Sequence, residues 1–259
     1  MTRPCLNKPF VQPPFRLREL LLTLPAPAEN LALDHALLNS ADAGAGAGEV
    51  LRLWEPAEPM VVLGRSSAAS EEVDLDACAA LRVPVLRRVS GGATIVSGPG
   101  CLMYAVLLDL NKRPEVRAVD RAHSLVFGAL VSALRPVIPS LRCAGTSDLV
   151  VEQAGGLLKC SGNSLRVGRN WLVYHGTLLY DFDLGLVSRV LREPRRQPDY
   201  RERRPHQDFL TNLPIDRTTL VECVRAAFGA GEALHEWPEE ETRLLVAKHY
   251  GREEWILQR

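Results

Sequence analysis

Lysine is the scarce residue of this chain. Of its 31 Lys and Arg residues, only four are lysines: Lys8, Lys112, Lys159 and Lys248. Three of them stand in polar or terminal stretches, whereas Lys159 follows two leucines and precedes a group of small residues that indicates a turn. Arginine does not replace a compact ammonium whose pKa shifts readily on burial. This position therefore indicates chemistry, and the alternative is a strand-end lysine that extends to solvent.

Excess charge, long apolar runs and paired cysteines are also absent. The 31 acidic and 31 basic residues balance, which excludes strong bulk attraction to nucleic acid or membranes. No apolar run reaches the roughly 18 residues of a membrane span, and the first 30 residues lack a signal-peptide core. The six cysteines form no C-x-x-C pair, which argues against a zinc ribbon or a redox dithiol. We expect a cytoplasmic protein with reduced thiols and no nucleic-acid or membrane partner.

The hydrophobic patterns predict a domain of the α+β (α/β) class, with mixed or antiparallel sheets flanked by helices. Residues 50–54 and 60–63 read as two strands that pair as a hairpin across a proline-containing turn. The other expected strands are 84–89, 102–108, 148–152, 156–160 and 170–180, and the expected helices are 30–39, 70–81, 120–134, 218–228 and 238–250.

A glycine pair follows one of these strands, in the run Arg87-Arg88-Val89-Ser90-Gly91-Gly92. Glycines at a strand exit let the backbone approach a ligand closely, and their N–H groups can surround an anion. Adjacent strand residues point to opposite faces, so one arginine can enter a pocket while the other pairs outside it. The run lacks the Lys-Ser/Thr of a P-loop. The alternatives are an anion-binding loop and a plain turn with solvent-facing arginines.

Two further positions are candidates for a site. His175 and Gly176 interrupt the otherwise apolar strand 170–180. A strand glycine often marks the close approach of a ligand or of another backbone, although a lone histidine there is more often structural. Arg65, at the end of an apolar run, is similar to an anion-binding residue at a strand end.

Together these motifs resemble the lipoate–protein ligases, which belong to the biotin/lipoate ligase and octanoyltransferase family. The resemblance covers roughly residues 28–185. It is carried by an ordered set of residues: Glu55 followed by Val62-Leu63-Gly64-Arg65, Arg87-Arg88-x-Ser90-Gly91-Gly92, Asp148-Leu149-Val150, Lys159-x-Ser161-Gly162 and His175-Gly176-Thr177-Leu178-Leu179.

The resemblance implies a catalytic domain over residues 1–215 and a short helical extension over residues 216–259. It implies an enzyme that joins lipoate or octanoate to ATP, with Mg²⁺, and transfers the acyl group to a lipoyl carrier domain. The carrier would be part of a 2-oxo acid dehydrogenase or the H protein of glycine cleavage. Because the family's ligases carry a larger C-terminal domain, the short extension also implies that a separate accessory protein could supply that part.

In this family Lys159 would be the catalytic cation that stabilises the transition states. The resemblance implies no metal-ligating residues. An apolar tunnel for the acyl chain is expected from residues such as Val89, Leu102, Tyr104 and Leu178. Substrate and nucleotide contacts would come from Arg65, Arg87, Ser90, Gly91, Gly92, Ala93, Ser161, Gly162, His175, Gly176 and Thr177.

The chain departs from the ligase pattern after Gly92, because the usual His-Asp is missing. The run Ser97-Gly98-Pro99-Gly100 instead resembles the His-Gly-Pro-Gly of octanoyltransferases without its histidine. A second interpretation is therefore an octanoyltransferase that needs no ATP and takes octanoate from acyl carrier protein through a cysteine thioester. Its nucleophile would be Cys143, with Cys101 and Cys160 as weaker candidates.

A third interpretation is a non-catalytic protein that binds a lipoyl domain or an acyl group. The arginine-rich segment 192–204 has two interpretations of its own. It is either a docking surface for an acidic lipoyl domain or a solvated loop.

Overall fold

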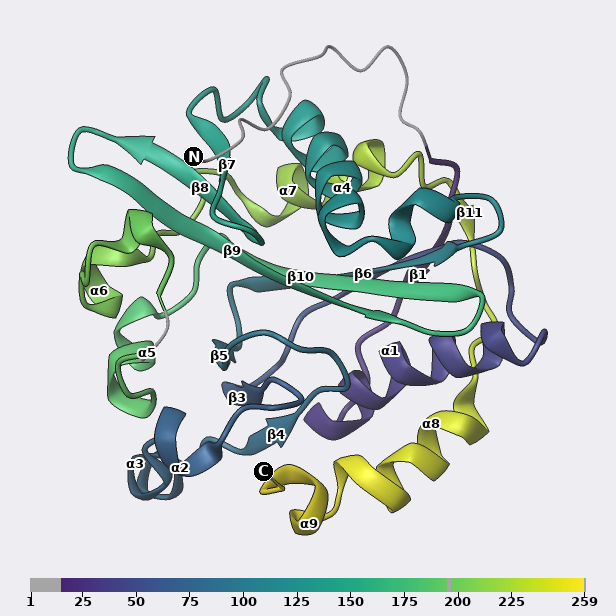
Figure 1. Cartoon of the computed structure of the whole chain (residues 1–259), viewed down its shortest axis with the longest axis horizontal. Coiled ribbons are helices and arrows are strands. Elements are labelled where there is room, and N and C mark those ends of the chain that lie inside the picture. The colour runs from purple at the N-terminus through teal and green to yellow at the C-terminus, as the bar shows by residue number, and fades with distance from the viewer. Residues whose placement is uncertain (1–14, 195–196, 259) are drawn as a thin grey trace.

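The computed structural model describes residues 15–194 and 197–258 and contains two β-sheets with helices on both sides (Figure 1). The larger sheet has eight strands in the order β11-β1-β2-β6-β10-β9-β8-β7, and the smaller has three in the order β4-β3-β5. The strands are β1 (Arg18–Leu21), β2 (Val50–Trp54), β3 (Met60–Leu63), β4 (Val85–Arg87), β5 (Ile95–Ser97), β6 (Cys101–Asp109), β7 (Leu141–Ala144), β8 (Asp148–Gln153), β9 (Gly156–Val167), β10 (Trp171–Leu179) and β11 (Glu232–Ala233).

The helices connect these strands and close the chain at its C-terminal end. The α-helices are α1 (Pro27–Asp42), α2 (Ala69–Glu72), α3 (Leu75–Leu81), α4 (Val119–Leu134), α5 (Leu184–Val190), α6 (His206–Phe209), α7 (Arg217–Ala227), α8 (Glu239–Leu245) and α9 (Glu253–Ile256). The remaining helical turns are the 3₁₀ segments η1 (Pro114–Arg117) and η2 (Asp199–Arg201) and the π-helical turn η3 (Val246–Tyr250). No helix among the described residues has the length and apolar character needed to cross a bilayer.

The predicted mixed α+β architecture is confirmed, because both sheets combine parallel and antiparallel pairs. The predicted hairpin of residues 50–54 and 60–63 is wrong. Strand β2 pairs with β1 and β6 in the large sheet, whereas β3 pairs with β4 and β5 in the small one. The intervening turn carries the chain from one sheet to the other, and the alternation of apolar residues does not reveal which partner a strand takes.

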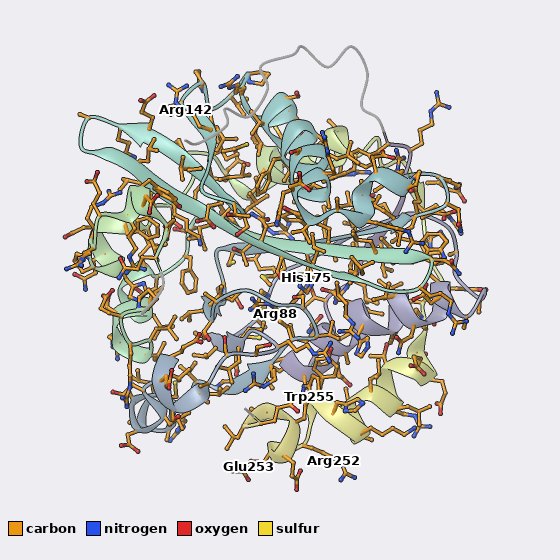
Figure 2. All side chains as sticks on the ribbon, viewed as in Figure 1. Arg88, Arg142, His175, Arg252, Glu253 and Trp255 are labelled. Carbon is orange, nitrogen blue, oxygen red and sulfur yellow. The ribbon has the colours of Figure 1, made fainter. Side chains whose placement is uncertain are left out.

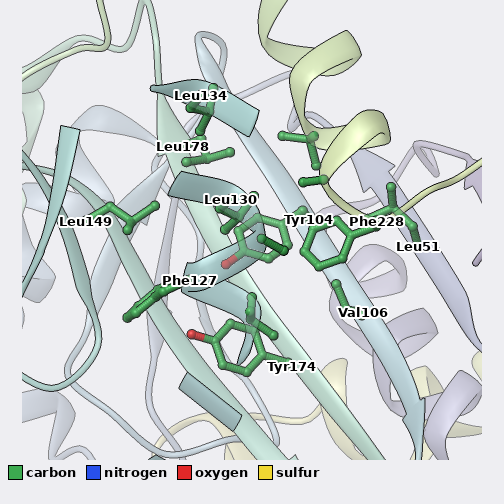
Figure 3. Close-up of a cluster of buried hydrophobic side chains, with 14 of the residues drawn as sticks. Leu51, Tyr104, Val106, Phe127, Leu130, Leu134, Leu149, Tyr174, Leu178 and Phe228 are labelled. Atoms are coloured by element: carbon green, nitrogen blue, oxygen red, sulfur yellow. The ribbon is translucent and has the colours of Figure 1, made fainter. Parts of the chain in front are cut away.

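One face of the large sheet is covered by α4 and α7, which lie side by side above it in Figure 1. Figure 3 shows the core beneath them, where Tyr104, Phe127, Tyr174 and Phe228 form an aromatic cluster. Leu220 and Val224 of α7 belong to the same core. The boundary predicted after residue 215 thus falls directly before a helix that packs into the main hydrophobic core.

The opposite face of the large sheet carries α1, on which α8 packs. Leu33 and Leu37 of α1 pack against β2, β6 and β10. Trp54, Leu63 and Tyr250 belong to a further buried cluster that joins the small sheet to α1 and the C-terminal helices. This arrangement leaves a cavity that is lined by residues of both sheets and of α1.

Candidate active site

The cavity has a volume of about 460 Å³ and is lined by both apolar side chains and charged groups. Its apolar lining includes Leu31, Trp54, Val62, Ile95 and Met103. Its charged lining consists of Asp34, Arg88, Asp148, Lys159 and His175. Of the four residues expected to form an acyl tunnel, only Tyr104 lines the cavity. Val89 is buried elsewhere, and Leu102 and Leu178 face the core under α4.

Lys159 lines this cavity from the middle of β9. The expected strand end is absent, because Ser161 and Gly162 continue the strand. Nζ of Lys159 lies 2.7 Å from Oδ1 of Asp148 on the neighbouring strand β8. The lysine side chain also passes over Gly162, where an added methyl group would lie 3.5 Å from Nζ. The site therefore holds a half-buried ammonium against one carboxylate, and an anionic ligand would compete with that carboxylate for it.

The side chains of Asp34 and His175, which line the cavity, form a hydrogen-bonded chain with Ser90, which does not line it. Nε2 of His175 lies 2.5 Å from Oγ of Ser90, and Nδ1 lies 3.2 Å from Oδ2 of Asp34. The other oxygen of Asp34 lies 2.6 Å from Nη1 of the fully buried Arg52. Burial opposes the charge on Asp34, but Arg52 and His175 hold the pKa of Asp34 below its usual value. An ionised Asp34 accepts a hydrogen bond from the N–H at Nδ1, which leaves Nε2 to accept a hydrogen bond from the Ser90 hydroxyl.

Asn163 explains why glycine occupies position 176. An added Cβ on Gly176 would lie 1.8 Å from Oδ1 of Asn163 and 2.8 Å from the Tyr104 ring. The Tyr104 hydroxyl donates to that same Oδ1 at 2.5 Å, and the Asn163 amide donates to Oγ of Ser161. Thr177, the next residue, accepts a hydrogen bond from the Gly162 amide at 3.3 Å. The glycine thus lets β9 and β10 exchange polar contacts beside Lys159.

The segment from Gly91 to Ala93 forms an exposed loop at the cavity. Gly92 has φ +86°, a conformation that favours glycine. The guanidinium of Arg88 donates to the Gly91 carbonyl at 2.5 Å and to the Ala93 carbonyl at 2.9 Å, and burial lowers its pKa to about 10. Within the described part of the chain, no acceptor is paired with the amides of these three loop residues. Their N–H groups can therefore receive an anion.

Arg87 is placed differently from the sequence-based expectation. Its buried guanidinium donates to the carbonyls of Gly64 and Ser67, and also to those of Ile256 and Gln258 near the C-terminus. It fastens the C-terminal segment to the loop after β3 and does not line the cavity. Figure 2 shows that Arg88 lies near His175 between the two sheets, whereas Trp255 lies among the C-terminal helices. Adjacent residues of an extended segment point to opposite faces, and of these two buried arginines Arg88 is the one that lines the cavity.

Arg65 is exposed at the loop after β3, where its amide donates to the Ser90 carbonyl at 2.8 Å. Its side chain does not line the cavity. Ser90 and Ser161 are both about 1% exposed. Their hydroxyl groups form hydrogen bonds with His175 and Asn163, respectively. The predicted residues that line the cavity directly are Gly92, Ala93, Lys159, Gly162, His175, Gly176 and Thr177.

Four site residues were absent from the sequence-based list: Asp34, Arg88, Asp148 and Asn163. Asp34 stands within the apolar pattern of α1, so its position on a buried face was a usable signal. Asp148 belongs to one of the motifs that carried the family resemblance, and Asn163 directly follows another. Neither residue was assigned a role from the sequence. Their contacts with Lys159 and Gly176 depend on strand register, which the motifs do not specify.

None of the five cysteines in the described part of the chain lines the cavity. Cys143 is half-buried on β7 and packs against the core under α4. It pairs in register with Leu149, whose side chain belongs to that core. Cys101 and Cys160 are fully buried, and burial raises the pKa of both thiols. In the described part of the chain, no group of three His, Cys, Asp or Glu residues could hold a metal ion.

Comparison with known proteins gives a consistent set of relatives. Residues 26–228 match the family model described as lipoyl protein ligase A/B catalytic domain. A Schizosaccharomyces pombe protein provisionally named lipoate-protein ligase A is 31% identical over 168 residues, which cover 65% of this chain and 42% of that protein. An Aeropyrum pernix protein with the same provisional name is 29% identical over 167 residues, covering 64% and 58%. The chain thus spans about half the length of these two relatives.

Octanoyltransferase LipM of Symbiobacterium thermophilum is 26% identical over 274 residues, covering 89% of this chain and 94% of that protein. Among solved structures, the bi-partite lipoate protein ligase of Thermoplasma acidophilum superimposes with a TM-score of 0.75 at 24% identity, covering 95% of this chain and 98% of that one. A lipoate-protein ligase A bound with ATP gives 0.73 at 24% identity, covering 94% and 99%. At these identities the structural likeness concerns the fold.

Proposed function

The chain belongs to the family of lipoyl protein ligase A/B catalytic domains, and on that premise we propose that it is a lipoate–protein ligase. The proposed substrates are lipoate or octanoate, ATP and a lipoyl carrier domain. The observation that carries the proposal is the position of Lys159. Its ammonium stands in a cavity that offers apolar walls for an acyl chain and unpaired loop amides for an anion.

In the first proposed step, a carboxylate oxygen of the acid forms a bond to the α-phosphorus of ATP. The bond between that phosphorus and pyrophosphate breaks. Negative charge accumulates on the phosphoryl oxygens, where Lys159 and the amides of the 91–93 loop would stabilise it. Mg²⁺ would enter with the nucleotide and be held largely by its phosphates.

In the second proposed step, the amine of a carrier lysine attacks the acyl carbon. A C–N bond forms, and the bond from that carbon to the oxygen of AMP breaks. Lys159 would again face the oxygen that gains charge. We propose as carriers the lipoyl domains of 2-oxo acid dehydrogenases or the glycine cleavage H protein. The Thermoplasma neighbour is a bi-partite ligase whose structure was analysed with its E2 lipoyl domain. This supports a lipoyl domain as carrier, and it supports the proposal of a separate accessory chain for this protein.

The compartment proposed for the reaction is the cytoplasm. The cysteines of the described residues form no disulfide with one another, which suits a reducing environment.

The test is the intact mass of an apo lipoyl domain incubated with the protein, lipoic acid and Mg-ATP. A gain of one lipoyl group that requires ATP is the expected result. The same gain without ATP would contradict the ligase assignment. No gain in either case, with an active ligase as positive control, would contradict a self-sufficient enzyme and direct attention to an accessory chain.

An octanoyltransferase is the second candidate, because LipM aligns over 89% of this chain and 94% of its own length. That reaction needs a nucleophilic thiol near Lys159, whereas Cys143 faces the core. The two candidates separate with octanoyl acyl carrier protein as donor and no ATP. Octanoylation of the carrier that disappears in Cys143→Ser would establish the transferase. Ligation that survives serine at each described cysteine would establish the ligase.

A further inference from the structure

The carboxylate of Asp148 has a different partner on each oxygen. Oδ1 lies 2.7 Å from Nζ of Lys159, and Oδ2 accepts a hydrogen bond of 2.7 Å from the hydroxyl of Tyr200. Tyr200 belongs to η2, 41 positions after Lys159 in the sequence, and does not line the cavity itself. We propose that Tyr200 is a positioning residue for Lys159 and that it acts through Asp148.

The proposal follows from the geometry of a shared carboxylate. An aspartate carboxylate rotates easily about its last torsion unless something holds it. With Oδ2 anchored by Tyr200, Oδ1 stays directed at the ammonium of Lys159. The Asp148 side chain is only 9% exposed, so water offers little substitute for a missing partner. Burial and the adjacent Asp148 raise the pKa of the Tyr200 phenol, which keeps it a donor.

Tyr200 is itself held firmly by its own segment. Its ring lies 5.3 Å from that of the buried Phe209, centroid to centroid. The guanidinium groups of Arg201 and Arg204 lie over the same Phe209 ring at 4.7 and 5.6 Å. This stacking fixes the position from which the phenol reaches Asp148.

The same segment also binds the backbone of β9 at Lys159 and two residues before it. Arg204 donates to the Leu157 carbonyl at 2.8 Å, and the amide of Thr211 donates to the Lys159 carbonyl at 2.9 Å. Both the main chain and, through Asp148, the side chain of Lys159 are therefore held by residues 200–211. Part of the arginine-rich segment 192–204 therefore has an internal role, in addition to the docking or solvated role expected from the sequence.

The chain offers a matched control in Tyr180. Its hydroxyl donates to Oε1 of Glu55 at 2.7 Å, and Oε2 of Glu55 lies 2.8 Å from Nε of Arg217. This is the same order of phenol, carboxylate and cation, but it lies outside the cavity lining. Tyr180→Phe therefore removes an equivalent hydrogen bond without touching Lys159.

The scarcity of lysine makes Lys159 directly observable. In protein labelled with ¹³C at lysine Cε, four lysines contribute signals, and Lys159→Gln identifies the one of interest by its disappearance. We expect Tyr200→Phe to move the Lys159 signal and to leave those of Lys112 and Lys248 in place, which also reports an intact fold. We expect Tyr180→Phe to move none of the three. A Lys159 signal that is unchanged in Tyr200→Phe, or that moves equally in Tyr180→Phe, would overturn the proposal.

The kinetic expectation rests on the proposed ligase function. Tyr200→Phe should lower kcat for carrier lipoylation about tenfold, as for the loss of one hydrogen bond to a charged group, and change KM for lipoate by less than about twofold. An unchanged kcat would overturn the positioning role. If the wild-type protein forms no lipoylated carrier while the Lys159 signal still moves in Tyr200→Phe, the positioning relation holds and the proposed function fails.

Discussion

The carboxylate of Asp34 lies 3.2 Å from Nδ1 of His175, and both of its oxygens are engaged because Arg52 binds the other one. Arg52 and Asp34 are almost completely buried. An ion pair in such surroundings is costly to break, since removal of one partner leaves an uncompensated charge. The histidine that lines the cavity is thus oriented by a carboxylate whose charge is balanced by the buried Arg52.

We predict that Asp34→Asn lowers the free energy of unfolding by about 3–5 kcal/mol near pH 7, because Arg52 loses its counter-charge. The folded-state pKa of Asp34 is below its usual value, so its stabilising effect is present above the unfolded pKa and is lost as pH falls through the folded value. The difference in the free energy of unfolding between wild type and Asp34→Asn should therefore become smaller below about pH 4. Urea unfolding curves from pH 7 to pH 3 measure it.

Asp76→Asn is the control for this change, because Asp76 is exposed on α3. It should alter stability by less than about 0.5 kcal/mol. Equal effects of the two substitutions would contradict the role given to the buried pair.

Lys159→Ala should lower the rate of the adenylation step about 10²–10³-fold, because the cation facing the developing charge is lost. Isotope exchange between pyrophosphate and ATP in the presence of lipoate measures that step without a carrier. Lys159→Arg should not restore it, since a planar guanidinium does not fit the place of a compact ammonium beside Asp148. The control is Lys112→Ala, at an exposed turn. Exchange that persists in Lys159→Ala would contradict the catalytic assignment.

The sequence predicted most elements of this fold because their patterns are local. The long helix predicted at 120–134 and the apolar strand predicted at 102–108 appear as α4 and β6, with shifts of only a residue or two. Strand partnership is not local, and the hairpin expected from 50–54 and 60–63 separates into two sheets. The turn between them is compatible with either outcome.

The site shows the same limit at the level of single side chains. Arg87 ends β4 and Arg88 directly follows it, so the two side chains point to opposite sides, but only the fold decides which side holds the cavity. Likewise, the spacing of Lys159 does not reveal Asp148 as its partner, because a register shift within the β8–β9 pair sets that contact. The glycine at 176 was a usable signal, since a glycine inside a strand indicates a close approach.

Gly176→Ala tests that close approach. The added methyl group would overlap Oδ1 of Asn163 and the Tyr104 ring, so one of these groups must move. We predict a loss of about 1–3 kcal/mol in the free energy of unfolding, as for overpacking of a core, together with reduced carrier lipoylation. Thermal unfolding and the mass assay measure the two effects. Gly155→Ala is the control, because an added methyl group there meets no atom within 4 Å.

His35 gives a prediction about pH. Burial lowers its pKa from 6.5 to about 4, and nearby positive charges on Arg166, His249 and Arg65 act in the same direction. Between these two values the unfolded chain binds more protons than the folded protein, so stability rises with pH across this window and falls on acidification. We expect a loss on the order of 2–3 kcal/mol between pH 7 and pH 4 that is absent from His35→Gln.

The measurement is the free energy of urea unfolding at half-unit intervals of pH for wild type, His35→Gln and His235→Gln. His235 is exposed, so its substitution should leave the pH dependence of the wild type intact. The His35 variant also loses the contact of 3.3 Å between Nδ1 and the Tyr250 hydroxyl, which lowers its stability by a constant amount and does not change the slope. Parallel curves for wild type and His35→Gln between pH 6.5 and pH 4 would show that His35 does not carry the pH dependence. A flatter curve for His35→Gln alone would show that α1 and the C-terminal turn η3 enclose a histidine that must stay neutral for the protein to remain folded.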